Sequence, residues 1–399
     1  MRKRCFAVLA VFLVLSLCAC SAPTAKRGTV VTEATSASEA TVPPTTEPAA
    51  SEPDNGEVWP TYRVEASELP LAIDIPEGCR LQINDAQAEH ILYTLQQSVL
   101  DEERMLSYDL TKAVGIYNTA SGTVTAQWAP AEAGWYFTGA LSGTQAAVFA
   151  RIDDYENAVP AHYSIVSFRA GAQNTLQSIT GAVQQMQHLG ETALFSYYDA
   201  DGRFGVRSVS PEDATDDVLL WQAKGKTVTP LAGDLSAFEG RFAYTCVQDG
   251  RCALITADLS GEQSRVSLEY LAERLDHFCL TPQGLLASLS LEEDTADAHR
   301  ELTLFASDGT RYRTKSYRPL YRMAFSSTLG CAVDSFYHVF VIAASRGRVL
   351  YRPFSPDLPE EMQSLLGQPL AILRGDDTFL YFYFTELQRL FLVRIAPAA

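Results

Sequence analysis

Long apolar runs are scarce in this sequence. Of its 399 residues 47% are hydrophobic, yet after the first twenty residues no segment is long and apolar enough for a membrane-spanning helix, which needs about 20. Positive charge is also in short supply, because 31 Lys and Arg face 48 Asp and Glu and give a net charge of −17. So acidic a chain is poorly suited to nucleic acid or to anionic lipid. We therefore expect no nucleic-acid partner and no second membrane segment.

Catalytic and metal-binding motifs are missing as well. The sequence has no Gly-x-Ser-x-Gly elbow, no phosphate-binding loop and no Cys-x-x-Cys. None of its six histidines lies two, three or four positions from another, so no helix or strand offers a histidine pair to a metal. Adjacent carboxylates such as Asp153 and Asp154 point to opposite faces of a strand. The sequence predicts no catalytic residue, no metal and no cofactor, and it leaves any ligand-binding residues unknown.

The first twenty residues contain the strongest local signal. Arg2, Lys3 and Arg4 are followed by an apolar run over 6–17, and the small Ala19 precedes Cys20. This arrangement resembles a bacterial lipobox, in which a signal peptide is cleaved before a cysteine whose thiol then receives palmitate or a similar acyl chain. The resemblance implies a signal peptide over 1–19 and lipidation of Cys20. Because acyl chains contribute about 0.8 kcal/mol per buried methylene, several of them would hold the exported protein on the outer face of the membrane.

Other interpretations of this segment stay open. Cys18 is an alternative acceptor, although Leu17 before it is bulky for that position. A plain secretory signal cleaved near Ala22 also fits, whereas an uncleaved membrane helix is disfavoured by the short apolar run.

A polar spacer follows the signal. Residues 21–57 are rich in Thr, Ser, Pro, Ala and Glu and hold almost no large apolar side chains. Such a segment cannot bury enough surface to offset the entropy lost on ordering. We expect 20–57 to be a lipid anchor with a disordered linker, and 58–399 to be the folded part.

Five scattered cysteines follow Cys20. Cys246 and Cys252 are the one suggestive pair among them. Asp249-Gly250 between them is a strong hairpin signal. A two-residue loop would pair Val247 with Cys252 and leave the sulfurs diagonal, whereas a three-residue loop would place the two cysteines opposite each other. A cross-strand disulfide is thus one interpretation, and burial as small apolar side chains is the other.

Strand patterns dominate beyond residue 100. Apolar or alternating runs of four to eight residues recur between Gly, Asp, Ser and Pro turns, and successive hairpins begin about every 40–50 residues, the period of four-stranded propeller blades. The pattern resembles the diverse β-propeller lipoproteins of bacteria, without a signature motif and without catalytic residues to carry across. It implies an all-β fold with seven blades as the best fit, within a range of six to eight. The clearest strands are 134–138, 146–152, 163–168, 193–198, 204–209, 241–245, 285–289, 302–306, 339–343, 349–352, 379–384 and 390–395.

The two ends of the folded part are expected to meet. Residues 379–395 form a strong hairpin that is apolar on both faces, and 59–75 is a short strand-like segment that cannot form a blade alone. Pairing of the two would close the ring and leave no long sheet edge exposed. Helix is scarce: 85–104, capped by Asn84, is the best candidate, and 268–277 is a second.

Binding is the function that these features favour. Trp128, Trp135, Tyr136 and Trp221 could stack on sugars or peptides at a blade mouth, although core packing is the favoured interpretation for all four. We expect a membrane-tethered scaffold that presents its propeller to an envelope protein, a peptide or a glycan. The alternatives are a secreted propeller hydrolase or lyase with its site in the central funnel, and a solute-binding lipoprotein of a transporter.

Overall fold

The computed structural model describes residues 59–397 with internal gaps, and contacts separate Met1–Trp59 from a second unit, Pro60–Ala399. The predicted signal peptide, Cys20 and the linker therefore lie outside the described residues. The internal gaps are 102–105, 157–158, 213–217, 223–234, 249–250, 260–262, 268–272, 292–299, 308–309, 317–319, 346–347 and 355–356.

Antiparallel strands make up nearly all regular structure of the described residues, as the sequence predicts. Five sheets have four strands each, and one has seven. The first three sheets comprise β2 (Cys79–Gln87), β3 (His90–Asp101), β4 (Leu106–Asn118) and β5 (Thr123–Trp128); β6 (Trp135–Ser142), β7 (Ala146–Glu156), β8 (Val159–Arg169), β9 (Ala172–Leu189), β10 (Thr192–Asp199), β11 (Phe204–Val209) and β12 (Val218–Gln222); and β13 (Leu235–Phe238), β14 (Arg241–Gln248), β15 (Arg251–Asp258) and β16 (Gln263–Ser267).

The remaining three sheets follow in chain order, except that the last takes its outer strand from the start of the folded part. They comprise β17 (Glu273–Thr281), β18 (Gly284–Leu291), β19 (Arg300–Ala306) and β20 (Arg311–Ser316); β21 (Leu320–Phe325), β22 (Leu329–Asp334), β23 (Val339–Ser345) and β24 (Arg348–Pro353); and β25 (Leu370–Arg374), β26 (Leu380–Phe384), β27 (Arg389–Pro397) and β1 (Tyr62–Leu69). One short helix, α2 (Glu360–Gln363), precedes β25.

The seven-stranded sheet consists of two four-stranded meanders that share β9. The first half of β9 pairs with β8 as far as Thr180, and the second half pairs with β10 from Gly181 onward. Gly181 has φ of 136°, and a Cβ there would lie 2.0 Å from the Tyr198 carbonyl oxygen. Glycine is therefore required where the strand changes partner.

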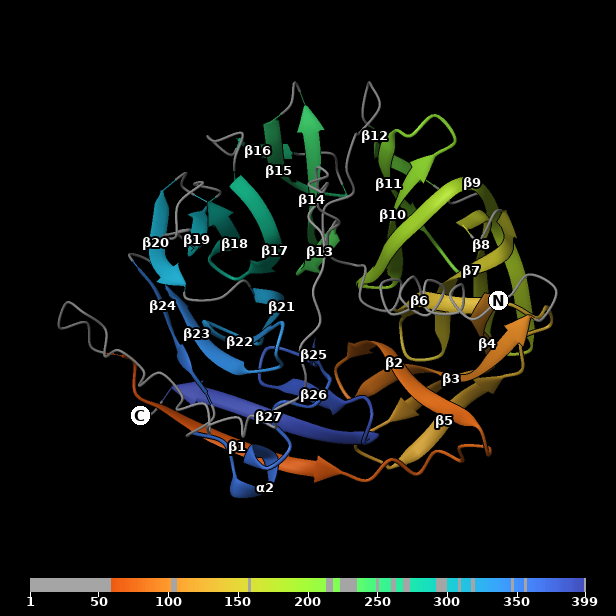
Figure 1. Cartoon of the computed structure of the whole chain (residues 1–399), viewed down its shortest axis with the longest axis horizontal. Coiled ribbons are helices and arrows are strands. Elements are labelled where there is room, and N and C mark those ends of the chain that lie inside the picture. Colours follow the sequence, from red (N-terminus) through yellow and green to blue (C-terminus); the bar gives the residue numbers. More distant parts are fainter. Residues whose placement is uncertain are drawn as a thin grey trace, which may run out of the picture. The chain divides into compact units, whose positions relative to one another are not determined.

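One strand of each meander contacts the corresponding strand of the next. These inner strands are β2, β6, the second half of β9, β13, β17, β21 and β25, and β25 in turn contacts β2. Figure 1 shows the sheets of this unit set side by side around a common centre, with the inner strands nearest to it. Apolar clusters fill the spaces between neighbouring sheets, so the core is divided into layers rather than gathered in one place.

A one-residue bulge recurs in the inner strands. In each case the extra residue is not paired with the second strand of its meander, and a bulge of this kind re-aims the side chains beside it. The extra residues are Asn84 in β2, Phe137 in β6, Gln184 in β9, Asp276 in β17 and Tyr321 in β21.

The residue after the bulge reaches the backbone of the next inner strand in four of these strands. Its side chain accepts a hydrogen bond from a backbone N–H or donates one to a carbonyl, so each contact ties two sheets together. Asp85 Oδ2 accepts from Leu141 at 2.8 Å, Thr138 Oγ1 from Met186 at 3.2 Å and Gln185 Oε1 from Leu235 at 3.3 Å, while Arg322 Nη1 donates to the Leu370 carbonyl at 3.4 Å.

The beginning and end of the folded part pair with each other, as the sequence predicts. β1 runs antiparallel to β27, with Tyr62 opposite Pro397 and Leu69 opposite Leu390. The Ala88 amide also donates to the Gly375 carbonyl at 2.6 Å, which joins the turn after β2 to the turn after β25.

The predicted helix over 85–104 is wrong over 85–101, because these residues form the end of β2, a tight turn and β3, while 102–104 lie outside the described residues. Residues 91–96 are buried, so the strand shows no alternation of polar and apolar side chains and its apolar positions mimic a helical stripe. The turn contains no glycine: Ala88 itself adopts φ of 48°. The second predicted helix, 268–277, is also wrong over 273–277, which belong to β17, while 268–272 lie outside the described residues.

Candidate binding site at the ends of the inner strands

Charged side chains from four different sheets meet at the carboxyl ends of the inner strands. Asp85 and His188 lie near the ends of β2 and β9. Arg374 ends β25, and Glu239 occupies the turn after β13. We call these four residues the charged cluster.

Asp85 is the best-bonded member of the charged cluster. Its Oδ1 accepts from the Ala86 amide at 2.9 Å, its Oδ2 accepts from the Leu141 amide at 2.8 Å, and His188 Nδ1 lies 2.8 Å from Oδ2. Only 13% of the Asp85 side chain is exposed. A carboxylate that accepts three hydrogen bonds from its own strand, from β6 and from β9 serves to join these strands.

This neighbour favours the charged form of His188. Burial lowers the pKa of His188, but the negative charge of Asp85 and its hydrogen bond to Nδ1 raise it by more, so the pKa stands above the ordinary value of 6.5. Arg374 opposes part of this rise. The imidazolium and carboxylate therefore form an ion pair between β9 and β2.

Arg374 connects the charged cluster to solvent. Its guanidinium lies 4.0 Å from the centre of the Phe238 ring and 4.0 Å from a carboxylate oxygen of Glu239, and it also pairs with Asp377. The Nε atom of Arg374 is buried without a hydrogen-bond partner. Glu239 and Asp377 are 54% and 66% exposed, so the outer side of the cluster is acidic and open.

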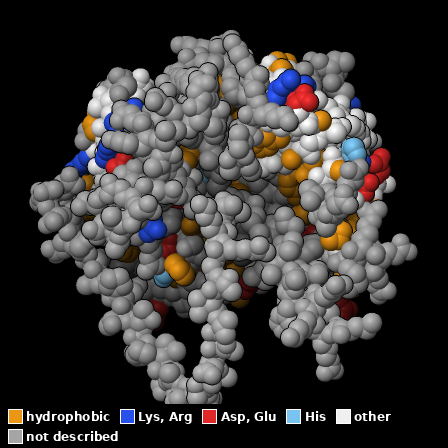
Figure 2. Space-filling view, turned by 45° about the horizontal axis from the view of Figure 1, so that its top comes forward, with side chains coloured by type: hydrophobic (Ala, Val, Ile, Leu, Met, Phe, Trp, Pro, Cys, Tyr) orange, Lys and Arg blue, Asp and Glu red, His pale blue; other side chains and the backbone are white. Residues whose placement is uncertain are grey.

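Exposed carboxylates stand on the tight turns that follow four inner strands. These acidic turns carry Glu89 after β2, Glu191 after β9, Glu239 after β13 and Asp377 after β25. On the face drawn in Figure 2 the described acidic and basic side chains lie in small mixed groups, with hydrophobic side chains visible between them. The acidic turns and the two basic residues of the charged cluster, His188 and Arg374, lie at the same ends of the inner strands. This end therefore offers a partner both signs of charge.

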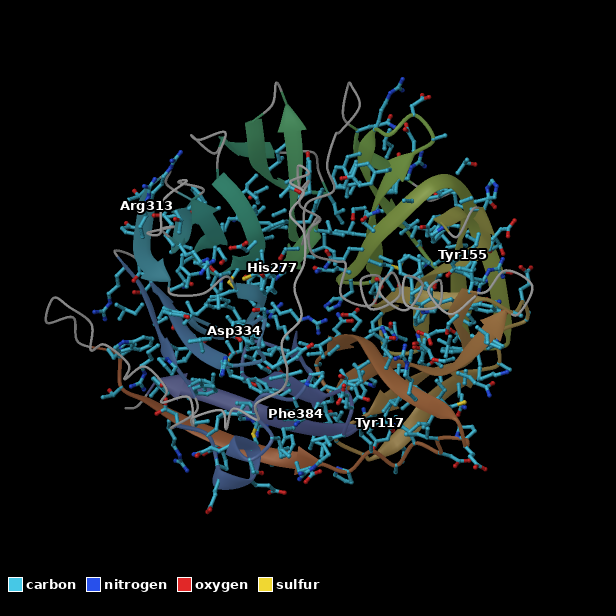
Figure 3. All side chains as sticks on the ribbon, viewed as in Figure 1. Tyr117, Tyr155, His277, Arg313, Asp334 and Phe384 are labelled. Atoms are coloured by element: carbon cyan, nitrogen blue, oxygen red, sulfur yellow. The ribbon has the colours of Figure 1, made fainter. Side chains whose placement is uncertain are left out.

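His277 is a second inner-strand histidine, and its environment is the opposite of that of His188. Burial and, to a lesser extent, the positive charge of Arg322 lower its pKa to about 4, so the ring is neutral at physiological pH. Figure 3 places His277 near the centre of the sheets and Arg313, on β20, at their outer edge.

The cysteine hairpin adopts the two-residue register. Val247 pairs with Cys252 and Cys246 pairs with Ala253, which is the less favourable of the two registers for a disulfide. The turn and the side chains of both cysteines lie outside the described part, so a Cys246–Cys252 bond stays a prediction. No group of His, Cys, Asp or Glu among the described residues is arranged to hold a metal ion.

The aromatic candidates divide between the core and its edge. Tyr136 is fully buried, and Trp128 packs 5.8 Å from Phe168 while its Nε1 donates to the Arg169 carbonyl at 2.9 Å. Trp135 is half-buried against Phe137, and its Nε1 is buried without a hydrogen-bond partner. The side chain of Trp221 lies outside the description. The packing of Tyr136 and Trp128 is the core role that the sequence favours.

The charged cluster itself escapes sequence reasoning. Asp85 and His188 are 103 residues apart, and neither belongs to a recognisable motif. The only available signal is a polar residue placed near the end of a largely apolar strand, and this recurs in many strands. Within the described residues, no helix is both long and apolar enough to cross a membrane.

Comparison with known proteins identifies the fold and nothing narrower. No family model and no curated protein matches the sequence. Among solved structures, YCF48 from Cyanidioschyzon merolae is similar, with 10% identity, 82% of this chain and 98% of that chain covered, and a TM-score of 0.50. BamB from Moraxella catarrhalis has 11% identity, with 84% of this chain and 100% of that chain covered, and a TM-score of 0.45. The chain adopts a β-propeller fold.

Proposed function

We propose that this chain is an exported lipoprotein, anchored through acyl chains on Cys20, that presents a seven-bladed β-propeller to a protein, peptide or glycan in the cell envelope. Five four-stranded sheets and the two halves of the seven-stranded sheet, among the described residues, support a count of seven. Contacts from each inner strand to the next, with β25 returning to β2, support closure of the ring by the two ends of the folded part.

The state of the charged cluster is the observation that carries a binding function. A general acid or base must reach its substrate, but Asp85 is occupied by two backbone amides and by His188. The acidic turns around it, by contrast, are exposed and come from separate sheets, so they can contact one large partner at several points. The alternative of a funnel hydrolase or lyase gains no support from this arrangement.

The solute-binding alternative would require two α/β lobes. The described residues instead form antiparallel sheets with a single four-residue helix. A propeller scaffold therefore accounts for the strands and for the charged cluster together, and the spacer predicted over 21–57 would hold it away from the bilayer.

In-cell photo-crosslinking tests this proposal. A photoreactive phenylalanine replaces Glu239 on an acidic turn or, as a matched control, Arg313 on the outer strand β20; the two side chains are 54% and 45% exposed. We expect one defined envelope product from position 239 and none from position 313. The same replacement at Asp377 provides a second position on an acidic turn. Equal products from positions 239 and 313, or no product from either 239 or 377, would overturn the assignment of the binding surface.

The anchor has its own test. Cys20→Ala should move the full chain from the membrane fraction to the soluble exported fraction, because acylation would be lost. If Cys18→Ala releases the protein and Cys20→Ala does not, Cys18 is the lipidated residue.

A further inference from the structure

We propose that His188 and Asp85 form a pH-sensitive latch, which fastens the carboxyl ends of three inner strands while His188 is protonated and loosens them when the ring loses its proton. The three strands are β2, β6 and β9, and they belong to three separate meanders of the fold.

The latch follows from the position of one carboxylate. Asp85, at the end of β2, binds the Leu141 amide of β6 and the His188 imidazolium of β9 at the same time, both at 2.8 Å. The two partners are 56 and 103 residues away along the chain, so no local structure holds them in place. The ion pair is thus a direct connection between β9 and β2.

Two hydrogen bonds next to the His188–Asp85 pair connect β2 and β6 to the acidic turn after β9. Gln87 Nε2 donates to the Gly190 carbonyl at 3.4 Å, and the Ser142 hydroxyl donates to the Glu191 carbonyl. Gln87 belongs to β2 and Ser142 to β6, the two strands that Asp85 joins. A change at the His188–Asp85 pair is therefore transmitted to the exposed Glu191.

The charges around His188 determine the direction of the response. Asp85 on β2 favours the imidazolium, and Arg374 on β25 opposes it; Glu191 and Glu239, on the turns after β9 and β13, are exposed. Arg374 is in turn offset by Asp377. Asp85 prevails, because it touches the ring and hydrogen-bonds to it.

Loss of the proton weakens the contact rather than abolishing it. A neutral imidazole still donates from Nδ1 in one tautomer, but a charge-assisted hydrogen bond is about twice as strong as a neutral one. Because folding raises the pKa of His188, its contribution is fully present below the unfolded value of about 6.5 and is lost as pH rises through the folded value. The contact is consequently strongest below about pH 6.5 and weakens as the pH rises through the His188 titration.

Hydrogen exchange at the Leu141 amide is the specific measurement, made by NMR on the full chain over a pH series. The protection factor, which removes the intrinsic pH dependence of exchange, should fall several-fold as pH rises through the His188 titration. His188→Gln keeps a neutral donor and should show low protection that does not change with pH. His162→Gln, which removes an exposed histidine of β8, should behave like the parent.

Two results would overturn the latch. One is a pH response of the Leu141 amide that survives in His188→Gln, and the other is parental protection that does not vary with pH. If His188→Gln fails to fold, the ring carbon shifts of His188 in the parent decide the matter: titration below the ordinary histidine value excludes a latch, and titration above it, with the Leu141 response, supports it.

Discussion

Two seams between neighbouring sheets are built from different chemistry. The terminal seam joins β2–β5 to the sheet of β25–β27 and β1, and tyrosines cross it: Tyr383 donates to the Leu81 carbonyl at 2.8 Å and Tyr381 to the Ala88 carbonyl at 3.0 Å. The consecutive seam joins β17–β20 to β21–β24, and its core is almost wholly apolar, with Leu302 and Ile342 fully buried. Figure 3 marks Tyr117 and Phe384 in the two sheets of the terminal seam.

The difference follows from how the chain connects the two sheets of each seam. β21 follows β20 along the chain, so the consecutive seam forms between neighbouring segments. Apolar packing holds it, together with a buried hydrogen bond that the Leu320 amide donates to the Ser288 hydroxyl at 3.2 Å. The terminal seam joins segments separated by about the whole length of the folded part, and a longer loop costs more entropy to close. Directional hydrogen bonds there stabilise one register of the two sheets, which apolar contact alone specifies poorly.

Removing β1 should have the largest effect of any change considered. Deleting residues 58–76 from the full chain leaves β27 without its outer neighbour and exposes its edge. We expect loss of a single cooperative melting transition in calorimetry. Deleting an equal length of the linker, 21–39, is the control and should leave melting unchanged. A 58–76 deletion that melts like the parent would show that β1 is dispensable.

The sequence predicts this terminal pairing because both segments are strand-like and both need a partner. The hairpin over 379–395 is apolar on both faces, and 59–75 is too short to form a blade alone. It also predicts the all-β fold, because Gly, Asp and Ser turns separate short apolar runs. It fails over 85–101, where burial of 91–96 removes the period-two signal and Ala88, rather than a glycine, adopts the left-handed conformation of the turn. The period-two signal is available only where one face of a strand meets water.

The charged cluster is beyond sequence reasoning for another reason. Asp85 is a polar residue near the end of a strand, and many strands have one. Its role depends on which other strands the fold places beside it. The bulge at Asn84 re-aims Asp85 toward β6 and β9, and a bulge is a property of pairing with β3 that the residues of β2 do not encode. Sites assembled from several sheets therefore need the structure.

Leu302→Ala tests the consecutive seam. The side chain is fully buried between β17–β20 and β21–β24, so truncation leaves a cavity and should cost about 2–5 kcal/mol of unfolding free energy. The measurement is the urea unfolding midpoint. Leu100→Ala, at a leucine that is 59% exposed, should change stability very little. A cost at Leu302 no larger than at Leu100 would mean that the seam is not close-packed.

Tyr383→Phe tests the terminal seam with a smaller change. It removes the hydroxyl that donates to the Leu81 carbonyl and should cost about 0.5–1.5 kcal/mol, the net contribution of one hydrogen bond. Tyr93→Phe is a matched control in the same seam, since the Tyr93 hydroxyl is buried with no hydrogen-bond partner. We expect this control to be neutral or slightly stabilising. Equal costs for the two variants would remove the distinction between the seams.

A pH dependence should also separate the two seams. His277 lies on β17, where that strand contacts β21, and it is neutral because burial and Arg322 lower its pKa to about 4. Its unfolded value is near 6.5, so between these two values the unfolded chain binds a proton that the folded chain does not. The stability that His277 contributes is therefore present above pH 6.5 and lost as pH falls toward 4.

The tyrosines of the terminal seam cannot respond in this range, because burial raises the pKa of Tyr381 to about 12. Urea midpoints from pH 7 downward should consequently fall less steeply in His277→Gln than in the parent, whereas Tyr383→Phe should keep the parental slope. If His277→Gln keeps the parental slope instead, the acid sensitivity lies elsewhere and His277 does not distinguish the seams.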